Sequence, residues 1–455
     1  MKVNPLMFRE YDIRGKVGED LTEEVAEAIG RAYGTIIKRK GGKQVVSGRD
    51  GRLSGPALQE ALIKGILSTG VDVINIGITP TPVMYFSLFK LDGIDGGIQV
   101  TGSHNPPEFN GFKICVGKET IYGPKIQEIR KLIEKEDFES GNGNLKLYDI
   151  LPEYKKFLKE NIKISSPLKV VLDCGNGVTA LTAPEVFKDQ GCKVTSLYCE
   201  VDGTFPNHFP DPVVEKNIRD LRAKVLEIGA DFGVGYDGDG DRIGVVDDKG
   251  EILWGDQLLI IFARDILKKH PGATIIGEVK CSQVMYDEIA RLGGRPIMWK
   301  TGHSLIKNKM KEEKALLAGE MSGHIFFADR YFGFDDAVYA SLRLAEIVAA
   351  SEIPLSEMLK DLPKMVSTPE IRVECPDEKK FEIVKLLTEK LKEEGYRVID
   401  IDGARVVFED GWGLVRASNT QPVLVLRFEA KNKEKLTEIQ TFIEKKLEEV
   451  KKEVC

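Results

Sequence analysis

The chain has 455 residues, which is long enough for several domains, and 65 Lys and Arg against 72 Asp and Glu leave a net charge of −7. This mild acidity argues against nucleic acid as the main partner, because nucleic-acid binding depends on clustered positive charge. No apolar run is long enough to cross a membrane, so we expect no membrane partner. Seven cysteines without metal-finger spacing, and an N-terminus without a signal peptide, predict free thiols and a cytoplasmic protein.

One pattern of β-prone segments occurs three times along the chain. Each segment is expected to end in a polar or glycine-rich loop that leads into a helix, which predicts largely parallel, helix-covered sheets. In such sheets, ligands bind at the carboxyl ends of the strands. The expected first strands are 44–50, 169–175 and 273–280, the second are 71–77, 192–198 and 295–299, and the third are 96–101, 231–236 and 315–319.

The pattern changes after residue 369. Strands are expected at 370–375, 405–408, 413–416 and 423–428, with a hairpin turn at 409–412, a charged helix near 377–394 and a closing helix rich in Lys and Glu. Residues 140–144, rich in Gly and Asn, predict a linker. The predicted fold is three related α/β domains with mixed, largely parallel sheets, plus a C-terminal α+β domain, around a central cleft. The expected domain limits are 1–145, 146–250, 251–367 and 368–455.

Three aspartates alternate with glycines directly after the third strand of the second repeat. Asp237, Asp239 and Asp241 repel one another strongly unless a cation joins them, and hard oxygen ligands favour Mg²⁺ or Ca²⁺. An acidic turn is the simpler alternative, since Asp and Gly are common turn residues. An EF-hand is disfavoured, because Arg242 stands where that loop needs Gly and Asp248 where it needs Glu.

Three further loops carry residues suited to chemistry. Each alone fits a turn or a helix cap about as well as a functional site. The first loop has a hydroxyl beside an imidazole. The second has a carboxylate, a hydroxyl and an imidazole. The third has a cation and hydroxyls, which suit the binding of a phosphate. They contain Ser103 and His104, then Glu320, Ser322 and His324, and finally Arg416, Ser418, Asn419 and Thr420.

A different reaction class is suggested by residues 175–180. They follow a predicted strand and match G-x-G-x-x-A, with Glu200 twenty residues beyond Ala180, as in a dinucleotide-binding fold. The alternative is therefore an NAD-dependent dehydrogenase. It leaves Ser103 and the aspartates unexplained.

Taken in order, the four loops resemble those of the α-D-phosphohexomutase family over essentially the whole chain. Within it, the sequence is most similar to the phosphomannomutase/phosphoglucomutase branch, since Met321 stands where phosphoglucosamine mutases typically carry Gln, and Asn419 where they usually carry Gly. Phosphoglucosamine mutase remains an alternative, as does a non-catalytic sugar-phosphate-binding protein. Gln421 departs from the family pattern, which leaves the fine phosphate contacts open.

The resemblance implies an enzyme, an isomerase that interconverts hexose 1-phosphate and hexose 6-phosphate, of mannose or glucose, through a phosphoserine and a bound hexose 1,6-bisphosphate. It implies Ser103 as the phosphate carrier, with Mg²⁺ held by Ser103 and the three aspartates. His104 and Lys113 are both candidates for proton transfer. Arg14, Lys113 and Arg242 are expected at the transferring phosphate, and the expected substrate contacts are Tyr11, Lys280, His303, Glu320, Ser322, His324, Arg416, Ser418, Asn419 and Thr420.

Overall fold

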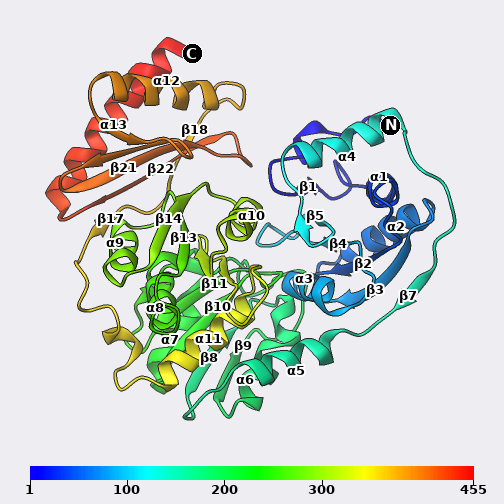
Figure 1. The fold of residues 1–455 in the computed structure, drawn as a ribbon, viewed down its shortest axis with the longest axis horizontal. Coiled ribbons are helices and arrows are strands. Elements are labelled where there is room, and N and C mark those ends of the chain that lie inside the picture. Colours follow the sequence, from blue (N-terminus) through cyan, green and yellow to red (C-terminus); the bar gives the residue numbers. More distant parts are fainter. Residues whose placement is uncertain (455) are drawn as a thin grey trace.

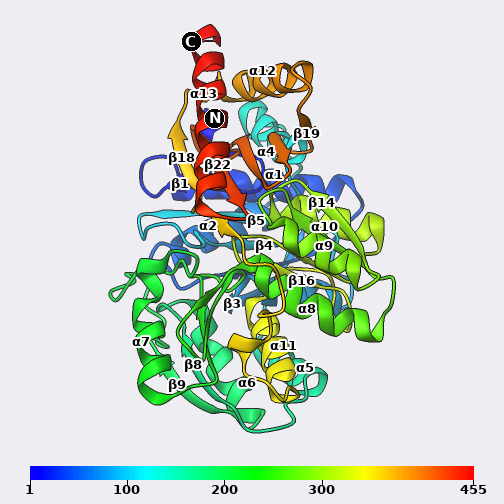
Figure 2. The ribbon, with the colours of Figure 1, turned by 90° about the vertical axis from the view of Figure 1, so that its left-hand side faces the viewer.

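The computed structural model describes residues 1–454, which form four units that follow one another along the chain (Figure 1). Each unit is built on its own sheet. The C-terminal unit lies at one end of the molecule and the second unit at the other (Figure 2). Among the described helices, none combines the length and the apolar character that a membrane span requires.

The first unit has the strand order β1-β5-β4-β2-β3-β7, with β6 beside β5. Its elements are β1 (Ile13–Lys16), α1 (Glu23–Arg39), β2 (Gln44–Arg49), α2 (Gly55–Leu67), β3 (Asp72–Ile78), α3 (Thr81–Lys90), β4 (Gly96–Val100), β5 (Phe109–Val116), β6 (Glu119–Thr120), α4 (Pro124–Lys135) and β7 (Leu145–Leu147), after a 3-10 turn at Pro5–Met7.

The second unit has the order β12-β11-β10-β8-β9, and the third β14-β13-β15-β16. The second contains α5 (Leu151–Asn161), β8 (Lys169–Asp173), α6 (Ala183–Asp189), β9 (Lys193–Leu197), α7 (Arg219–Ile228), β10 (Phe232–Tyr236), β11 (Ile243–Asp247) and β12 (Ile252–Leu253), with 3-10 turns at Val178–Leu181 and Glu215–Ile218. The third contains α8 (Gly255–Lys269), β13 (Thr274–Glu278), α9 (Gln283–Arg291), β14 (Arg295–Trp299), α10 (His303–Glu313), β15 (Leu317–Gly319), β16 (Ile325–Phe327) and α11 (Ala337–Ala349), followed by a 3-10 turn at Leu355–Glu357.

The C-terminal unit is an antiparallel sheet of order β17-β22-β21-β20-β19, with β18 also beside β22 and two helices packed on the sheet. It contains β17 (Val366–Ser367), β18 (Ile371–Glu374), α12 (Lys380–Glu393), β19 (Arg397–Ile399), β20 (Ala404–Phe408), β21 (Gly411–Ala417), β22 (Val423–Ala430) and α13 (Lys433–Val454). The α+β prediction for this part of the chain is confirmed.

The predicted threefold repeat is confirmed by the pairing of the strands. In each of the first three units, the first strand lies between the second and the third, and all three run parallel. A fourth strand then pairs antiparallel with the third. The third strand and the loop that follows it therefore have the same position in the sheet of each of these three units.

The general pattern of a strand, a loop and then a helix does not hold after the third strands, whereas the prediction of mixed sheets is confirmed. β4, β10 and β15 each turn back into an antiparallel partner, namely β5, β11 and β16. Those partners are rich in β-branched and aromatic residues, which pack well on a pleated surface. Every candidate loop, including the one between β21 and β22, is thus the connection of a hairpin.

The expected linker at 140–144 instead packs against α2 and β3. The Gly141 and Gly143 amides donate to the carbonyls of Ser68 and Leu67, at 2.9 and 2.8 Å. A Cβ on Gly143 would lie 2.1 Å from the carbonyl oxygen of Val71, so glycine serves close backbone approach here and not flexibility. The segment leads into β7, which extends the first sheet.

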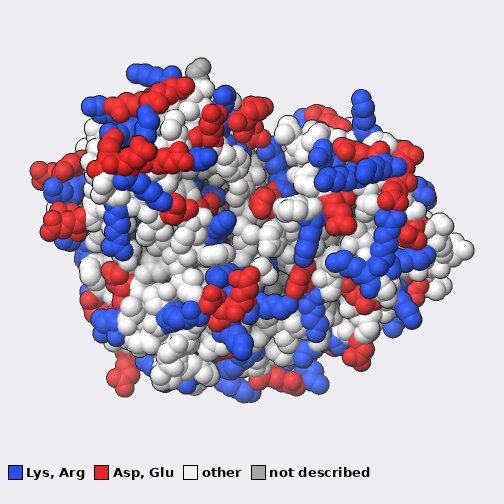
Figure 3. Space-filling model, turned by 45° about the horizontal axis from the view of Figure 1, so that its top comes forward, with Lys and Arg blue, Asp and Glu red and all other residues white. Residues whose placement is uncertain are grey.

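The first three units share one hydrophobic core, and aromatic rings join them. Phe86 of α3 meets Tyr154 of α5 at 5.4 Å between ring centroids, and Phe89 stacks on Phe332 at 4.8 Å. The C-terminal unit has a core of its own. In Figure 3 the surface is notched between this unit and the first, and Lys and Arg mix with Asp and Glu over the visible face.

Two buried arginines of the C-terminal unit hold the backbone of the third. Arg405 donates to the carbonyls of Val279 and Cys281, at 2.6 and 2.9 Å, and its guanidinium lies 3.8 Å from the Trp412 ring centroid. Arg427 donates to the carbonyl of Lys280. The C-terminal unit is therefore attached to the segment that presents Lys280.

Candidate active site

Ser103 lies in the hairpin between β4 and β5. Its φ of 51° is in the left-handed region, which non-glycine residues seldom occupy outside turns and functional sites. The backbone N–H of Ser103 donates to Thr101 Oγ1 at 2.8 Å, and its own Oγ donates to Asp237 Oδ2 at 3.0 Å. His104 Nδ1 lies 3.1 Å from the same Oγ. The serine hydroxyl therefore faces an imidazole and the aspartate cluster at once.

A buried arginine that the sequence analysis missed holds this loop in place. Arg52 donates to the backbone carbonyls of Ser103 and Asn105 at 2.8 and 2.5 Å, and to those of Pro106 and Phe109 at 2.6 and 2.9 Å. Its charge is balanced by Asp50, at 3.2 Å. A single side chain thus holds four backbone carbonyls of the Ser103 loop.

The aspartate cluster is fully buried. Asp237, Asp239 and Asp241 are each 0% exposed, and one oxygen of each lies within 4.8 Å of the others. Asp237 Oδ1 accepts three backbone N–H groups, from Gly240, Asp241 and Arg242, at 2.9–3.1 Å. Burial, and then repulsion from the other two carboxylates, raises the pKa of Asp237 well above its usual range. A cation would remove that repulsion.

The carboxylate oxygens of the cluster are suitable ligands for a divalent cation. Thr81 Oγ1 and Lys113 Nζ donate to Asp239 Oδ2 at 2.5 and 2.8 Å, and Lys113 also pairs with Asp241. Asp239 Oδ1 is buried and has no hydrogen-bond partner among the described residues. An unpaired buried carboxylate oxygen is costly, and a hard metal ion takes such oxygens as ligands. The three aspartates therefore form an acidic triad able to hold a metal.

The hairpin between β15 and β16 meets this cluster. His324 Nε2 lies 3.3 Å from Asp241 Oδ1, and its Nδ1 lies 3.1 Å from Glu320 Oε2 and 2.9 Å from Ser322 Oγ. Arg242 Nε lies 3.4 Å from His324 Nε2. Glu320 also accepts the backbone N–H of Gly302 at 2.7 Å. These residues, far apart in sequence, form one hydrogen-bonded network with the aspartates.

Two further predicted residues flank the network. Arg14 on β1 donates to Asn105 Oδ1 at 2.8 Å and pairs with Asp12 at 2.8 Å. His303 begins α10 and lies with its ring 5.6 Å from that of His324, and neither of its ring nitrogens has a hydrogen-bond partner among the described residues. Arg14 is therefore beside the Ser103 loop, and His303 has free hydrogen-bonding capacity beside the Glu320 loop.

The loop between β21 and β22 brings residues of the C-terminal unit to the first unit. Arg416 is held by Asp402 at 3.0 Å, and Asn419 Nδ2 donates to Tyr11 Oη at 2.5 Å. Ser418 Oγ accepts hydrogen bonds from the backbone N–H groups of Thr420 and Gln421, at 3.3 and 3.2 Å. Tyr11 in turn donates to the carbonyl of Thr301 at 2.6 Å. The loop thus contacts the first unit through Tyr11.

Lys280 lies at the carboxyl end of β13 between two carboxylates. Its Nζ is 3.2 Å from Glu370 Oε2 and 3.8 Å from Glu278 Oε1. The nearby Lys280 ammonium is the main cause that lowers the pKa of Glu370 to about 2. Because Glu370 precedes β18, this ion pair links the third unit to the C-terminal one.

We expect Glu370→Gln to reduce stability in a pH-dependent way. The folded pKa of Glu370 lies below its ordinary value of 4.5, so its contribution is present above pH 4.5 and is lost as the pH falls towards 2. Since 31% of this side chain is exposed, screening limits the loss at pH 7 to about 1 kcal/mol. Urea unfolding at pH 7 and pH 3 measures it. Glu374→Gln on the same strand is the matched control, and equal midpoints for both variants at pH 7 contradict the prediction.

The four domain models of phosphoglucomutase/phosphomannomutase match residues 5–140 (domain I), 152–250 (domain II), 254–366 (domain III) and 370–446 (C-terminal domain). The chain belongs to the phosphoglucomutase/phosphomannomutase family. The resemblance drawn from the four loops is confirmed.

Curated relatives match this chain along nearly their whole length. A phosphomannomutase/phosphoglucomutase of Pseudomonas aeruginosa PAO1 is 50% identical over 444 residues, which are 98% of this chain and 96% of that one. A phosphoglucomutase of Neisseria meningitidis Z2491 is 46% identical over 438 residues, 95% of each chain. The crystal structure of a phosphoglucomutase/phosphomannomutase family protein from Burkholderia thailandensis superposes with a TM-score of 0.94 at 45% identity, covering 99% of this chain and 98% of that one.

The dehydrogenase alternative is not favoured. The glycine loop at 175–180 packs on the backbone of the aspartate loop, where Val178 N donates to the carbonyl of Gly238 at 3.2 Å. A Cβ on Gly177 would lie 3.0 Å from Gly238 Cα. The glycine pattern in this family member thus serves contact between two loops. The backbone of Glu200, the expected ribose ligand, accepts from Asn176 at 2.9 Å.

Several polar and charged residues around the site, most of them buried, escaped the sequence analysis. Most of them hold a residue that the sequence did predict. Their position along the sequence could have indicated two of them, since Asp50 and Glu278 both stand at the carboxyl end of a first strand. The missed residues are Asp12, Asp50, Arg52, Thr81, Glu278, Asp335 and Asp402.

Proposed function

We propose that the protein interconverts hexose 1-phosphate and hexose 6-phosphate, of mannose or glucose, with Ser103 carrying the phosphoryl group between the two ends of the sugar. One observation carries the proposal: a serine hydroxyl in a left-handed turn lies 3.0 Å from a buried triad of carboxylates. An isolated serine hydroxyl is a weak nucleophile, and such surroundings can activate it. Relatives named for both sugars support this substrate class.

Ser103, Asp237, Asp239 and Asp241 are the residues proposed to hold Mg²⁺. When bound, the ion would neutralise the charge of the transferring phosphoryl group. Arg14, Lys113 and Arg242 contribute positive charge around the same point. Lys113 is held between two carboxylates and so serves as a fixed cation, whereas the His104 ring touches the serine hydroxyl and is placed to exchange its proton.

The other end of the substrate is proposed to lie against the C-terminal unit. Arg416, with Ser418, Asn419 and Thr420, would hold the phosphate that is not transferred, and Lys280 stands nearby. Glu320 and Ser322, with His303, His324 and Tyr11, would contact the sugar. A hexose 1,6-bisphosphate, formed after the first transfer, then turns over so that the same groups bind its opposite end. We also propose a cytoplasmic location and the domain limits 1–145, 146–250, 251–367 and 368–455, which differ by two or three residues from the ends of the sheets at β7, β12 and β17.

We expect activity with both mannose 1-phosphate and glucose 1-phosphate in a coupled assay that contains Mg²⁺ and a trace of hexose 1,6-bisphosphate. Chelation with EDTA should reduce turnover to background, and added Mg²⁺ should restore it, because the buried triad cannot stabilise the transfer without a counter-charge. Turnover of glucosamine phosphate alone would instead favour a phosphoglucosamine mutase. Binding of sugar phosphates with no turnover of any would indicate a non-catalytic binding protein.

A further inference from the structure

A cavity of about 600 Å³ lies at the seam between the first and third units. Its walls come from α3 and the β6 region of the first unit, and from α10 and the loop after β16 of the third. The volume is in the range of small-molecule sites. None of the residues that line it belongs to the predicted active site, so the cavity has no role in the function proposed above.

Aromatic rings form much of the wall. Phe89 and Phe332 stack across the seam at 4.8 Å, and Tyr85 and Phe334 meet at 5.5 Å. Tyr85 Oη and Ser304 Oγ are buried and have no hydrogen-bond partner among the described residues. Because buried hydroxyls are normally satisfied, the wall retains hydrogen-bonding capacity for an occupant. The interior therefore suits a planar group with polar atoms at its edge.

The rim of the cavity is positively charged. Lys118, Lys125, Lys311 and Lys314 line it and are exposed, with Glu119 as their one carboxylate in the lining. Lys311 and Lys125 share Glu119 at 2.5 and 3.8 Å, and Lys118 Nζ lies 4.7 Å from the Phe89 ring centroid. One carboxylate cannot neutralise four ammonium groups. On a chain of net charge −7, the rim therefore has a local excess of positive charge.

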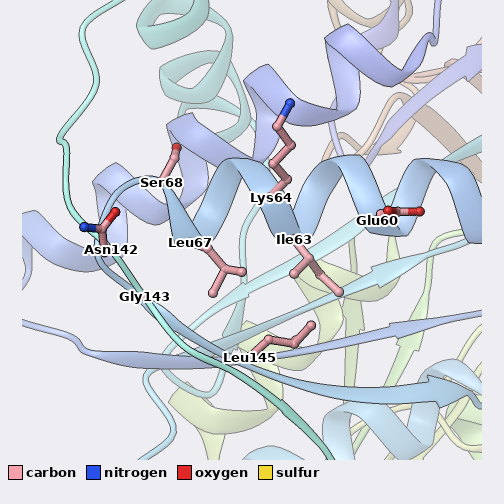
Figure 4. Close-up of a pocket in the computed structure, with 8 residues that line it drawn as sticks. All are labelled: Glu60, Ile63, Lys64, Leu67, Ser68, Asn142, Gly143 and Leu145. Atoms are coloured by element: carbon pink, nitrogen blue, oxygen red, sulfur yellow. The ribbon is translucent and has the colours of Figure 1, made fainter.

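A second hollow, of about 340 Å³, differs from this cavity in its lining. It lies between α2 and residues 142–145, and its lining has one cation, Lys64 (Figure 4). Lys64 is already paired with Glu27 at 2.8 Å. The lining of this hollow has no aromatic ring and no unpaired cation.

We propose that the cavity between the first and third units binds a planar aromatic anion of about mononucleotide size. The ring would lie against Phe89 and Phe332, and the negative group would face the rim lysines. This inference is independent of the proposed sugar-phosphate chemistry, because the two sites share no residue.

The test uses the full chain with Mg²⁺ and 8-anilinonaphthalene-1-sulfonate, an aromatic anion whose fluorescence rises in apolar surroundings. We expect saturable binding at one site that glucose 1-phosphate does not displace. The double variant Lys118→Gln/Lys311→Gln should raise the Kd by about fivefold or more, since it removes two attractive charges. Ala328→Phe should abolish the saturable signal, because it fills the cavity from a lining position. The control Lys156→Gln, on α5, is equally exposed and should leave the Kd unchanged.

Two competitors distinguish the source of the ligand. Displacement of the probe by AMP indicates a nucleotide, and displacement by 2-naphthoate alone indicates an aromatic carboxylate. The proposal is overturned if neither competes, if glucose 1-phosphate displaces the probe, or if the double lysine variant binds it as tightly as the wild type. The lysine variant keeps the test decisive even if Ala328→Phe fails to fold, because both lysines are exposed on the surface.

Discussion

Replacing Ser103 by Ala is expected to lower mutase turnover by about 10⁴-fold or more, the scale seen when a catalytic nucleophile is removed. The loss follows because Ser103 Oγ contacts both His104 and Asp237. Mass spectrometry of the purified protein provides the second measurement. Phosphate should be found on Ser103 in the wild type and be missing from the variant.

Ser322→Ala is the matched control for this prediction. Its hydroxyl lies 2.9 Å from His324 Nδ1 but belongs to the loop proposed to contact sugar hydroxyls. We expect a loss of kcat/KM of about tenfold, equivalent to one hydrogen bond, with the phosphate on Ser103 retained. Full activity in Ser103→Ala would disprove the phosphoserine mechanism, whatever Ser322→Ala does.

Arg52→Met is expected to lower the free energy of unfolding by about 3–5 kcal/mol, because it leaves the buried Asp50 carboxylate without its partner. It also removes the four hydrogen bonds that hold the Ser103 loop. Turnover should therefore fall even at temperatures where the variant remains folded. Denaturant unfolding and the coupled assay measure the two effects separately.

Two variants separate the geometry of Arg52 from its charge. Arg52→Lys keeps the cation but cannot reach four carbonyls with a planar fork, so we expect kcat to fall while the Asp50 charge stays balanced. Arg49→Met is the neighbouring control, since Arg49 makes one long contact of 3.4 Å to the carbonyl of Asp50 and should cost less than about 1 kcal/mol. Arg52→Met with wild-type stability and turnover would show that the loop does not need this support.

Much of the fold follows from local pattern. The three repeats were visible because each uses β-branched strands of similar spacing, and the strand-end rule correctly brought the Ser103 loop to the aspartates. Of the antiparallel partner strands, β16 was missed because it is only Ile325–Phe327, too short to show alternation. The support around the site was missed for another reason. Arg52 and Thr81 act through contacts to residues 51 or more positions away, and nothing in their own neighbourhood marks them.

Each of the four site loops is tied at both ends to a strand ladder. The two ends of a loop fastened in this way move with its sheet. Under the proposed function, access for a sugar phosphate would then come from rotation of a whole sheet. The C-terminal sheet is the candidate for such a rotation, since one core cluster spans the first three units and the C-terminal unit has a core of its own. Its axis would pass through the contacts of Arg405 and Arg427, so catalysis would depend on residues that never touch the sugar.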